Sequence, residues 1–155
     1  MLNRYLGSAL GLAVLLAGSA MATTPALPPE YSAFRLAYRM SYFGFDVCGD
    51  TADGKLYRKA LAEKVEHCPF TPAAKADFRR WSVEADIFGA ADVQRYIAEH
   101  DKLPERLDEK RVACRKEQAT PAYQKTIALL AGYGKGEVPY DAVVPDACDT
   151  KAGGP

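Results

Sequence analysis

The stretch TPAAKADFRRWSVEADIF, residues 71–88, carries the clearest folding signal in the chain. Its apolar residues recur at intervals of four, three, four and three positions, which places them along one face of an α-helix. It opens with Thr71 and Pro72, a hydroxyl residue suited to cap a helix followed by a residue suited to the first helical position. We therefore predict a helix whose buried seam consists of Ala74, Phe78, Trp81, Ala85 and Phe88.

The helical period continues on both sides of this stretch. Gly89 is expected to bend or end the first helix, and a further helical piece follows it. Upstream, one apolar stripe stops at Gly49 and another at Pro69, residues that do not continue a helix. Downstream, Pro104 and Pro121 open two more helices. The expected helices cover residues 30–48, 55–67, 71–88, 90–101, 103–117 and 120–132.

No alternating run of β-branched residues indicates a strand. The predicted fold class is therefore all-α: a small bundle of five to six short helices, cross-linked by two disulfides, with an extended C-terminal tail from Glu137 onward. The length suits a single helical domain over residues 30–149, followed by a disordered tail over residues 150–155.

The first 22 residues, MLNRYLGSALGLAVLLAGSAMA, have the three parts of a cleavable signal peptide. Arg4 supplies the positive charge, an apolar run follows from Leu6, and Ala20-Met21-Ala22 forms a small-x-small cleavage site. The apolar run is short for a bilayer core about 30 Å thick, although an uncleaved anchor is the competing interpretation. Residues 23–29 are Pro-rich and are expected to form a disordered lead-in. We expect a periplasmic or secreted protein.

Composition excludes two classes of partner for the mature chain. Cleavage removes one base, Arg4, and no acid, so the balanced 20 basic and 20 acidic residues become a net charge of −1. A nucleic-acid binder needs a basic excess, so we expect no nucleic-acid partner. No later run reaches 18 apolar residues, so we expect no stable membrane insertion after signal cleavage.

Four cysteines, an even number in an exported chain, indicate two disulfides. If the first two helices are antiparallel neighbours, Cys48 and Cys68 lie at opposite ends of the second helix, on the order of 25 Å apart. Bonded cysteines need Cα atoms about 4.4–6.8 Å apart. We therefore expect Cys114 and Cys148 to be the partners of the first two, with the order of pairing left open.

Motifs for catalysis, cofactors and metals are missing. The sequence holds no GxSxG, no CxxC and only two histidines, His67 and His100. The stretch Gly49–Leu56 shares an Asp-Gly step with a calcium loop but lacks two of the anchoring carboxylates, so a polar turn and helix cap is favoured. We predict no catalytic residue, no cofactor and no metal ligand.

Aromatic side chains crowd the first expected helix. Tyrosine joins an apolar ring to a polar tip, so such a face suits a well-filled core, the wall of an apolar cavity or a protein interface. The candidate ligand or partner face consists of Tyr31, Phe34, Tyr38, Tyr42, Phe45 and Trp81.

These observations favour a non-enzymatic exported protein that binds another protein, for example as an inhibitor, an immunity factor or an assembly factor. The alternative is a carrier of a small apolar ligand in a cavity between helices. An enzyme with an unrecognised site is the third hypothesis.

Overall fold

The computed structural model describes residues 32–144 and residue 148. The predicted signal peptide (residues 1–22), lead-in (23–29) and terminal tail (150–155) lie outside the described residues, as does Tyr31. The described part contains α-helices and no strand, which confirms the all-α class. The α-helices are α1 (Ser32–Gly44), α2 (Thr51–His67), α3 (Pro72–His100), α4 (Pro104–Gln118), α5 (Pro121–Gly134) and α6 (Tyr140–Val143), with a 3-10 turn, η2 (Asp46–Cys48), after α1.

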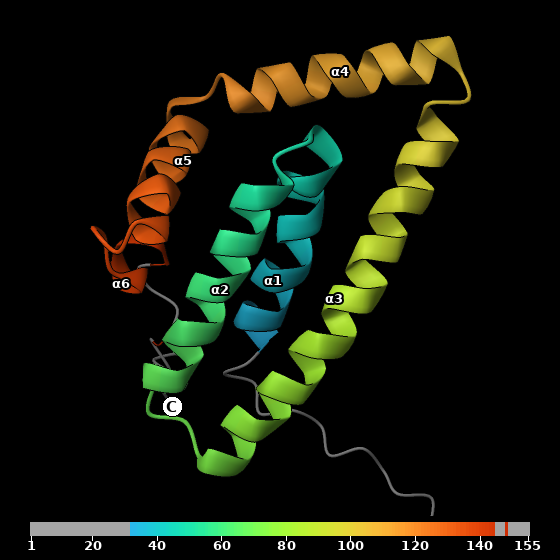
Figure 1. Cartoon of the computed structure of the whole chain (residues 1–155). Coiled ribbons are helices and arrows are strands. Elements are labelled where there is room, and N and C mark those ends of the chain that lie inside the picture. Colours follow the sequence, from blue (N-terminus) through green and yellow to red (C-terminus); the bar gives the residue numbers. More distant parts are fainter. Residues whose placement is uncertain (1–31, 145–147, 149–155) are drawn as a thin grey trace, which may run out of the picture.

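Three helices form the body of the fold and two frame it (Figure 1). α1 packs against both α2 and α3, and α5 and α6 pack against α2. α4 crosses from the far end of α3 to the start of α5, so α3, α4 and α5 enclose α1 and α2 on three sides (Figure 1). α4 itself has no buried residue.

The two predicted hydroxyl–proline starts are confirmed. The hydroxyl of Thr71 accepts a hydrogen bond from the backbone N–H of Ala74 at 3.2 Å, at the start of α3. The hydroxyl of Thr120 accepts one from Tyr123 at the same distance, at the start of α5. Each bond satisfies one of the backbone donors that the first turn of a helix leaves without an intrahelical partner.

The core lies where α1, α2 and α3 meet. Phe34 of α1, Leu61 of α2 and Phe78 of α3 are almost completely buried, and the rings of Phe34 and Phe78 meet edge to face at 6.4 Å. Burying one such side chain contributes about 1.5–3 kcal/mol. The predicted seam of α3 is buried as far as Ala85, but Phe88 is 66% exposed, so that part of the prediction is wrong.

Gly89 does not end α3, which runs on to His100. A Cβ atom placed there would lie 2.4 Å from Cε2 of Tyr42, so glycine is needed for the close approach of α1. The sequence suggested a helix break, but the structure shows that glycine at this position lets α1 and α3 pack closely.

Replacing Gly89 with alanine is expected to lower the free energy of unfolding by about 1–3 kcal/mol, because the ring of Tyr42 must move. Gly44→Ala is the matched control, since nothing lies within 4 Å of its added Cβ atom; it should stabilise by up to about 1 kcal/mol. Urea denaturation of both variants measures the difference. Equal effects of the two substitutions would contradict the packing role of Gly89.

Helix α2 begins at Thr51, four residues earlier than predicted. Gly54, expected in a turn, lies inside the helix, where an added Cβ would come within about 3 Å of Phe45, Asp46 and Arg58. The residues of the weak calcium-loop match are therefore largely helical. Asp50 stands at the N-cap position without a side-chain capping bond, and its carboxylate accepts hydrogen bonds from Tyr123 and, at 2.8 Å, from Gln118.

The disulfides are Cys48–Cys114 and Cys68–Cys148, with Cα–Cα distances of 5.4 and 5.5 Å. The expectation that Cys48 and Cys68 do not pair is confirmed, and the structure decides the order that the sequence left open. The first bond ties α4 to the end of η2, and the second ties Cys148 to the end of α2.

The segment after Glu137, predicted to be extended, contains the one-turn helix α6. Val143 and Val144 are buried, and the ring of Tyr140 stacks on His67 at 4.8 Å. Asp141 pairs with Lys64 of α2. Four residues are too few to show a helical period, which explains why α6 was not predicted.

Candidate functional site

Helix α1 carries a second apolar stripe that faces away from the core. Leu36, Met40 and Phe43 are 62%, 56% and 46% exposed, and their spacing of four and three residues places them on one side of the helix. Large exposed apolar side chains grouped in this way are typical of a binding surface. We call these three residues the open face of α1.

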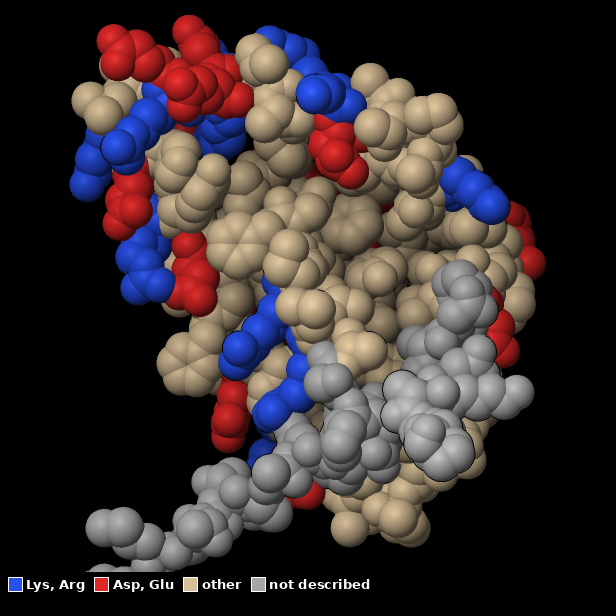
Figure 2. Space-filling model, turned by 180° about the vertical axis from the view of Figure 1, so that it is seen from behind, with Lys and Arg blue, Asp and Glu red and all other residues tan. Residues whose placement is uncertain are grey.

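Two grooves border the open face. The groove between α1 and α3 has a volume of about 400 Å³ and includes Phe43 and the exposed Phe88. The groove between α1 and α5 has a volume of about 290 Å³ and includes Met40 and Tyr123. Seen from behind, the molecule shows a hollowed tan surface with charged side chains gathered around it (Figure 2).

Arg35 and Arg39 of α1 line the groove beside α3. Their guanidinium carbons lie 4.5 Å and 5.9 Å from the ring centre of Trp81. Burial and the neighbouring charge of Arg39 lower the pKa of Arg35, and Glu84 partly offsets this effect. Within the described part of the chain, the buried Nε atom of Arg35 has no hydrogen-bond partner.

The other side of the α1–α2–α3 body contains a buried charged network centred on Arg58. The Nη1 atom of Arg58 donates to Asp46 at 2.8 Å and to the hydroxyl of Ser41 at 3.0 Å. Its guanidinium carbon lies 3.9 Å from the ring centre of Tyr42. Arg58 and Asp46 are both less than a tenth exposed, so water cannot replace either partner.

Asp86 of α3 joins the same network from the solvent side. Its Oδ1 atom accepts hydrogen bonds from the hydroxyls of Tyr38, at 2.8 Å, and Tyr42, and lies 3.9 Å from Nε of Arg58. Burial raises the pKa of both tyrosines, and their bonds to Asp86 raise it further. Both hydroxyls therefore stay protonated as donors to Asp86 at neutral pH.

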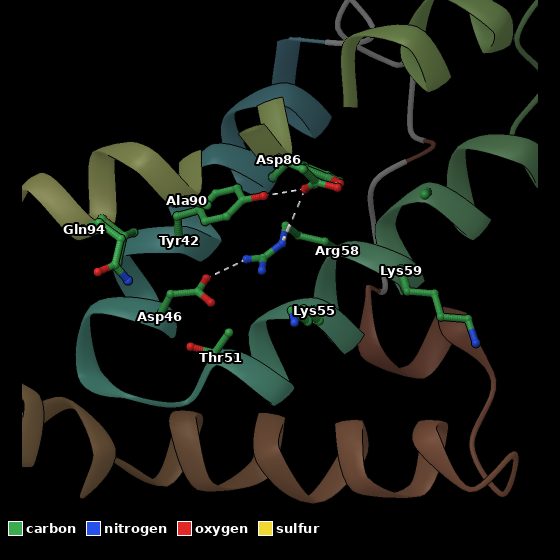
Figure 3. Close-up of a pocket in the computed structure, with 12 residues that line it drawn as sticks. Tyr42, Asp46, Thr51, Lys55, Arg58, Lys59, Asp86, Ala90 and Gln94 are labelled. Carbon is green, nitrogen blue, oxygen red and sulfur yellow. Dashed lines mark hydrogen bonds and ion pairs between the residues drawn. The ribbon is translucent and has the colours of Figure 1, made fainter. Parts of the chain in front are cut away.

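A cleft of about 470 Å³ lies between α2 and α3, and the residues of this network form its floor (Figure 3). Arg58 reaches across it from α2 toward Asp46 and Asp86, and Tyr42 approaches from α1 (Figure 3). The lining residues are Tyr38, Tyr42, Asp46, Thr51, Lys55, Arg58, Lys59, Ala62, Asp86, Ala90, Val93 and Gln94.

The aromatic residues singled out in the sequence are mostly core residues. Phe34, Tyr38, Tyr42, Phe45 and Trp81 are each at most 9% exposed. They do not form one exposed face: Tyr38 and Tyr42 line the cleft, Trp81 and Tyr42 line the groove between α1 and α3, and Phe45 lines the groove beside α5.

The open face of α1 was missed although a signal for it exists. Leu36, Met40 and Phe43 repeat at helical spacing, but the aromatic stripe on the opposite side explained helix formation without them. Arg58 and Asp86 were not candidates either, because their contacts join three different helices.

The described residues hold no group of three or more side chains arranged to bind a metal ion. His67 and His100 each contact the backbone carbonyl four residues earlier through Nδ1 and stack on a tyrosine. None of the described helices is long and apolar enough to cross a membrane.

With this geometry established, the chain was compared with protein-family models, with curated proteins and with solved structures, and none of the three comparisons finds a match. The fold and its surfaces therefore provide the functional argument.

Proposed function

We propose that this is an exported, non-enzymatic helical protein that binds another protein through the open face of α1, for example as an inhibitor, an immunity factor or an assembly factor. The observation that carries the proposal is the exposure of Leu36, Met40 and Phe43 on one side of one helix. The two disulfides and the lack of a membrane-spanning helix among the described residues are compatible with export.

The partner's chemistry follows from the charges beside the face. Arg35 and Arg39 stand next to each other on Trp81, and burial disfavours the charge of Arg35. A carboxylate from the partner would reduce the repulsion between the two guanidinium groups and would favour the charged form of Arg35. The occupant that fits is an amphipathic helix whose apolar side chains enter the two grooves and whose acidic residue meets the arginines.

Replacing Met40 with aspartate is expected to weaken partner binding by at least about thirtyfold, because a charge would be desolvated at the centre of the interface. Val83→Asp is the matched control: Val83 is 62% exposed but lines neither groove, so the affinity should change less than about twofold. A photo-crosslinking amino acid at position 36 identifies the partner in the producing cell, and calorimetry with the purified partner measures both variants.

Three outcomes would contradict the proposal. They are a partner that binds Met40→Asp as tightly as the unchanged protein, an equal loss with Val83→Asp, and no protein crosslinked from position 36. A crosslink between two copies of the chain would show that the open face mediates self-association and does not bind a different protein.

A further inference from the structure

The cleft between α2 and α3 has the size of a small-molecule site and is separate from the open face of α1. Its volume of about 470 Å³ lies within the common range for ligand pockets, about 300–1,000 Å³. Ala62, Ala90 and Val93 provide apolar contact area, and a few polar groups lie among them. None of the residues of the open face lines the cleft.

The charges around the cleft are not balanced. Its two carboxylates, Asp46 and Asp86, both pair with Arg58. The other two cations, Lys55 and Lys59, make no ion pair within the described residues; Lys59 lies only over the ring of Tyr133, at 5.6 Å. Lys55 is therefore the cation of the cleft that is left for an external anion, and such an anion would also reduce the repulsion between like charges four residues apart on α2.

The floor of the cleft is formed by buried side chains that are already bonded to one another. Tyr38, Tyr42, Asp46 and Arg58 are buried and linked by hydrogen bonds that join α1, η2, α2 and α3 through Asp86. A preformed floor reduces the conformational entropy that binding must cost. In Figure 3, Lys55 stands on α2 beside this floor and Lys59 extends away from Arg58.

We propose that the cleft binds a small organic anion with an apolar tail. The anionic group lies at Lys55, and the apolar tail lies along Ala62, Ala90 and Val93. Arg58 supports the floor and does not supply a free positive charge, because Asp46 and Asp86 already occupy it.

The test uses three probes that separate charge from apolar tail: octanoate, octanol and acetate. Titration of the 15N-labelled protein should show saturable NMR shifts for octanoate that include Val93 and Gln94. Octanol, which lacks the charge, should bind about tenfold more weakly, the effect of one charge-assisted hydrogen bond. Acetate should cause no saturable shift. Equal binding of octanol, or octanoate shifts away from the cleft, overturns the proposal.

Two variants locate the site. Ala90→Trp fills the cleft from an exposed helical position and should abolish the octanoate shifts. Lys55→Gln should weaken octanoate about tenfold and leave octanol unchanged, whereas Lys125→Gln on α5 should change neither. If Ala90→Trp does not fold, Lys55→Gln and the three probes still decide. Unchanged octanoate affinity in Lys55→Gln overturns the proposal. Met40→Asp should bind octanoate normally, so failure of the proposed function and failure of this site are distinguishable.

Discussion

Replacing Arg58 with methionine is expected to lower the free energy of unfolding by about 3–5 kcal/mol. Methionine preserves much of the side chain's volume but leaves the buried Asp46 carboxylate without its cation at 2.8 Å. The substitution also removes the donor to Ser41 and the cation over the ring of Tyr42. The cost arises mainly from the remaining buried charge, which has lost both its water and its partner. Urea denaturation followed by circular dichroism measures the difference.

The matched control for Arg58 is Arg79→Met. Arg79 pairs with Glu66 at 2.7 Å, a distance close to that of the buried pair, but its side chain is 59% exposed. Water and salt screen such a pair, so the control should cost at most about 1 kcal/mol. Adding Asp46→Asn to Arg58→Met should recover part of the lost stability, because it removes the unpaired charge. Equal costs for Arg58→Met and Arg79→Met would contradict the role assigned to burial.

Much of the fold could be predicted because its signals are local. A helix start depends on the side chain of one residue and the backbone three positions later, as at Thr71 and Thr120. The exclusion of a Cys48–Cys68 bond required only the length of one helix. The continuity of α3 through Gly89 was missed because the reason for that glycine lies on another helix, in the ring of Tyr42.

The candidate sites could not be predicted in the same way. In the sequence, an arginine between lysines on a charged helix has the pattern of a solvent-exposed residue. Arg58 is buried only because Asp46, Ser41 and Asp86 converge on it from other elements. The open face of α1 presents the opposite difficulty. Helix α1 has two apolar stripes, and from the sequence either could face the core. Only the positions of α2 and α3 decide that the aromatic stripe is buried.

Removing the Cys48–Cys114 bond by replacing both residues with alanine is expected to cost about 4 kcal/mol of unfolding free energy. The bond closes a loop with a sequence separation of 66, and the chain-entropy model gives about 3 kcal/mol for a 15-residue loop and about 4.7 kcal/mol for a 100-residue loop. Removing Cys68–Cys148, with a separation of 80, should have a similar effect on global stability. The two double variants differ in what they release: the first frees α4 from the end of η2, and the second frees Cys148 from the end of α2.

Helix α4 depends on its disulfide more than any other helix of the described part, because it has no buried residue. Its other links to the body include Gln118, which donates to Asp50 at 2.8 Å and to the backbone oxygen of Cys48 at 3.5 Å, and the ion pair between Lys110 and Asp101. A 15-residue helix that buries no side chain gains little stability from packing, and an isolated helix of this length is only marginally stable in water. Amide hydrogen exchange over α4 should therefore accelerate by a larger factor than exchange over α2 when Cys48–Cys114 is removed, whereas removal of Cys68–Cys148 should not produce this local change. Slow exchange over α4 in the Cys48→Ala, Cys114→Ala variant would show that α4 is held by contacts other than the disulfide. Rapid exchange there would mean that the Cys48–Cys114 bond is the main link that holds α4 against the body of the fold.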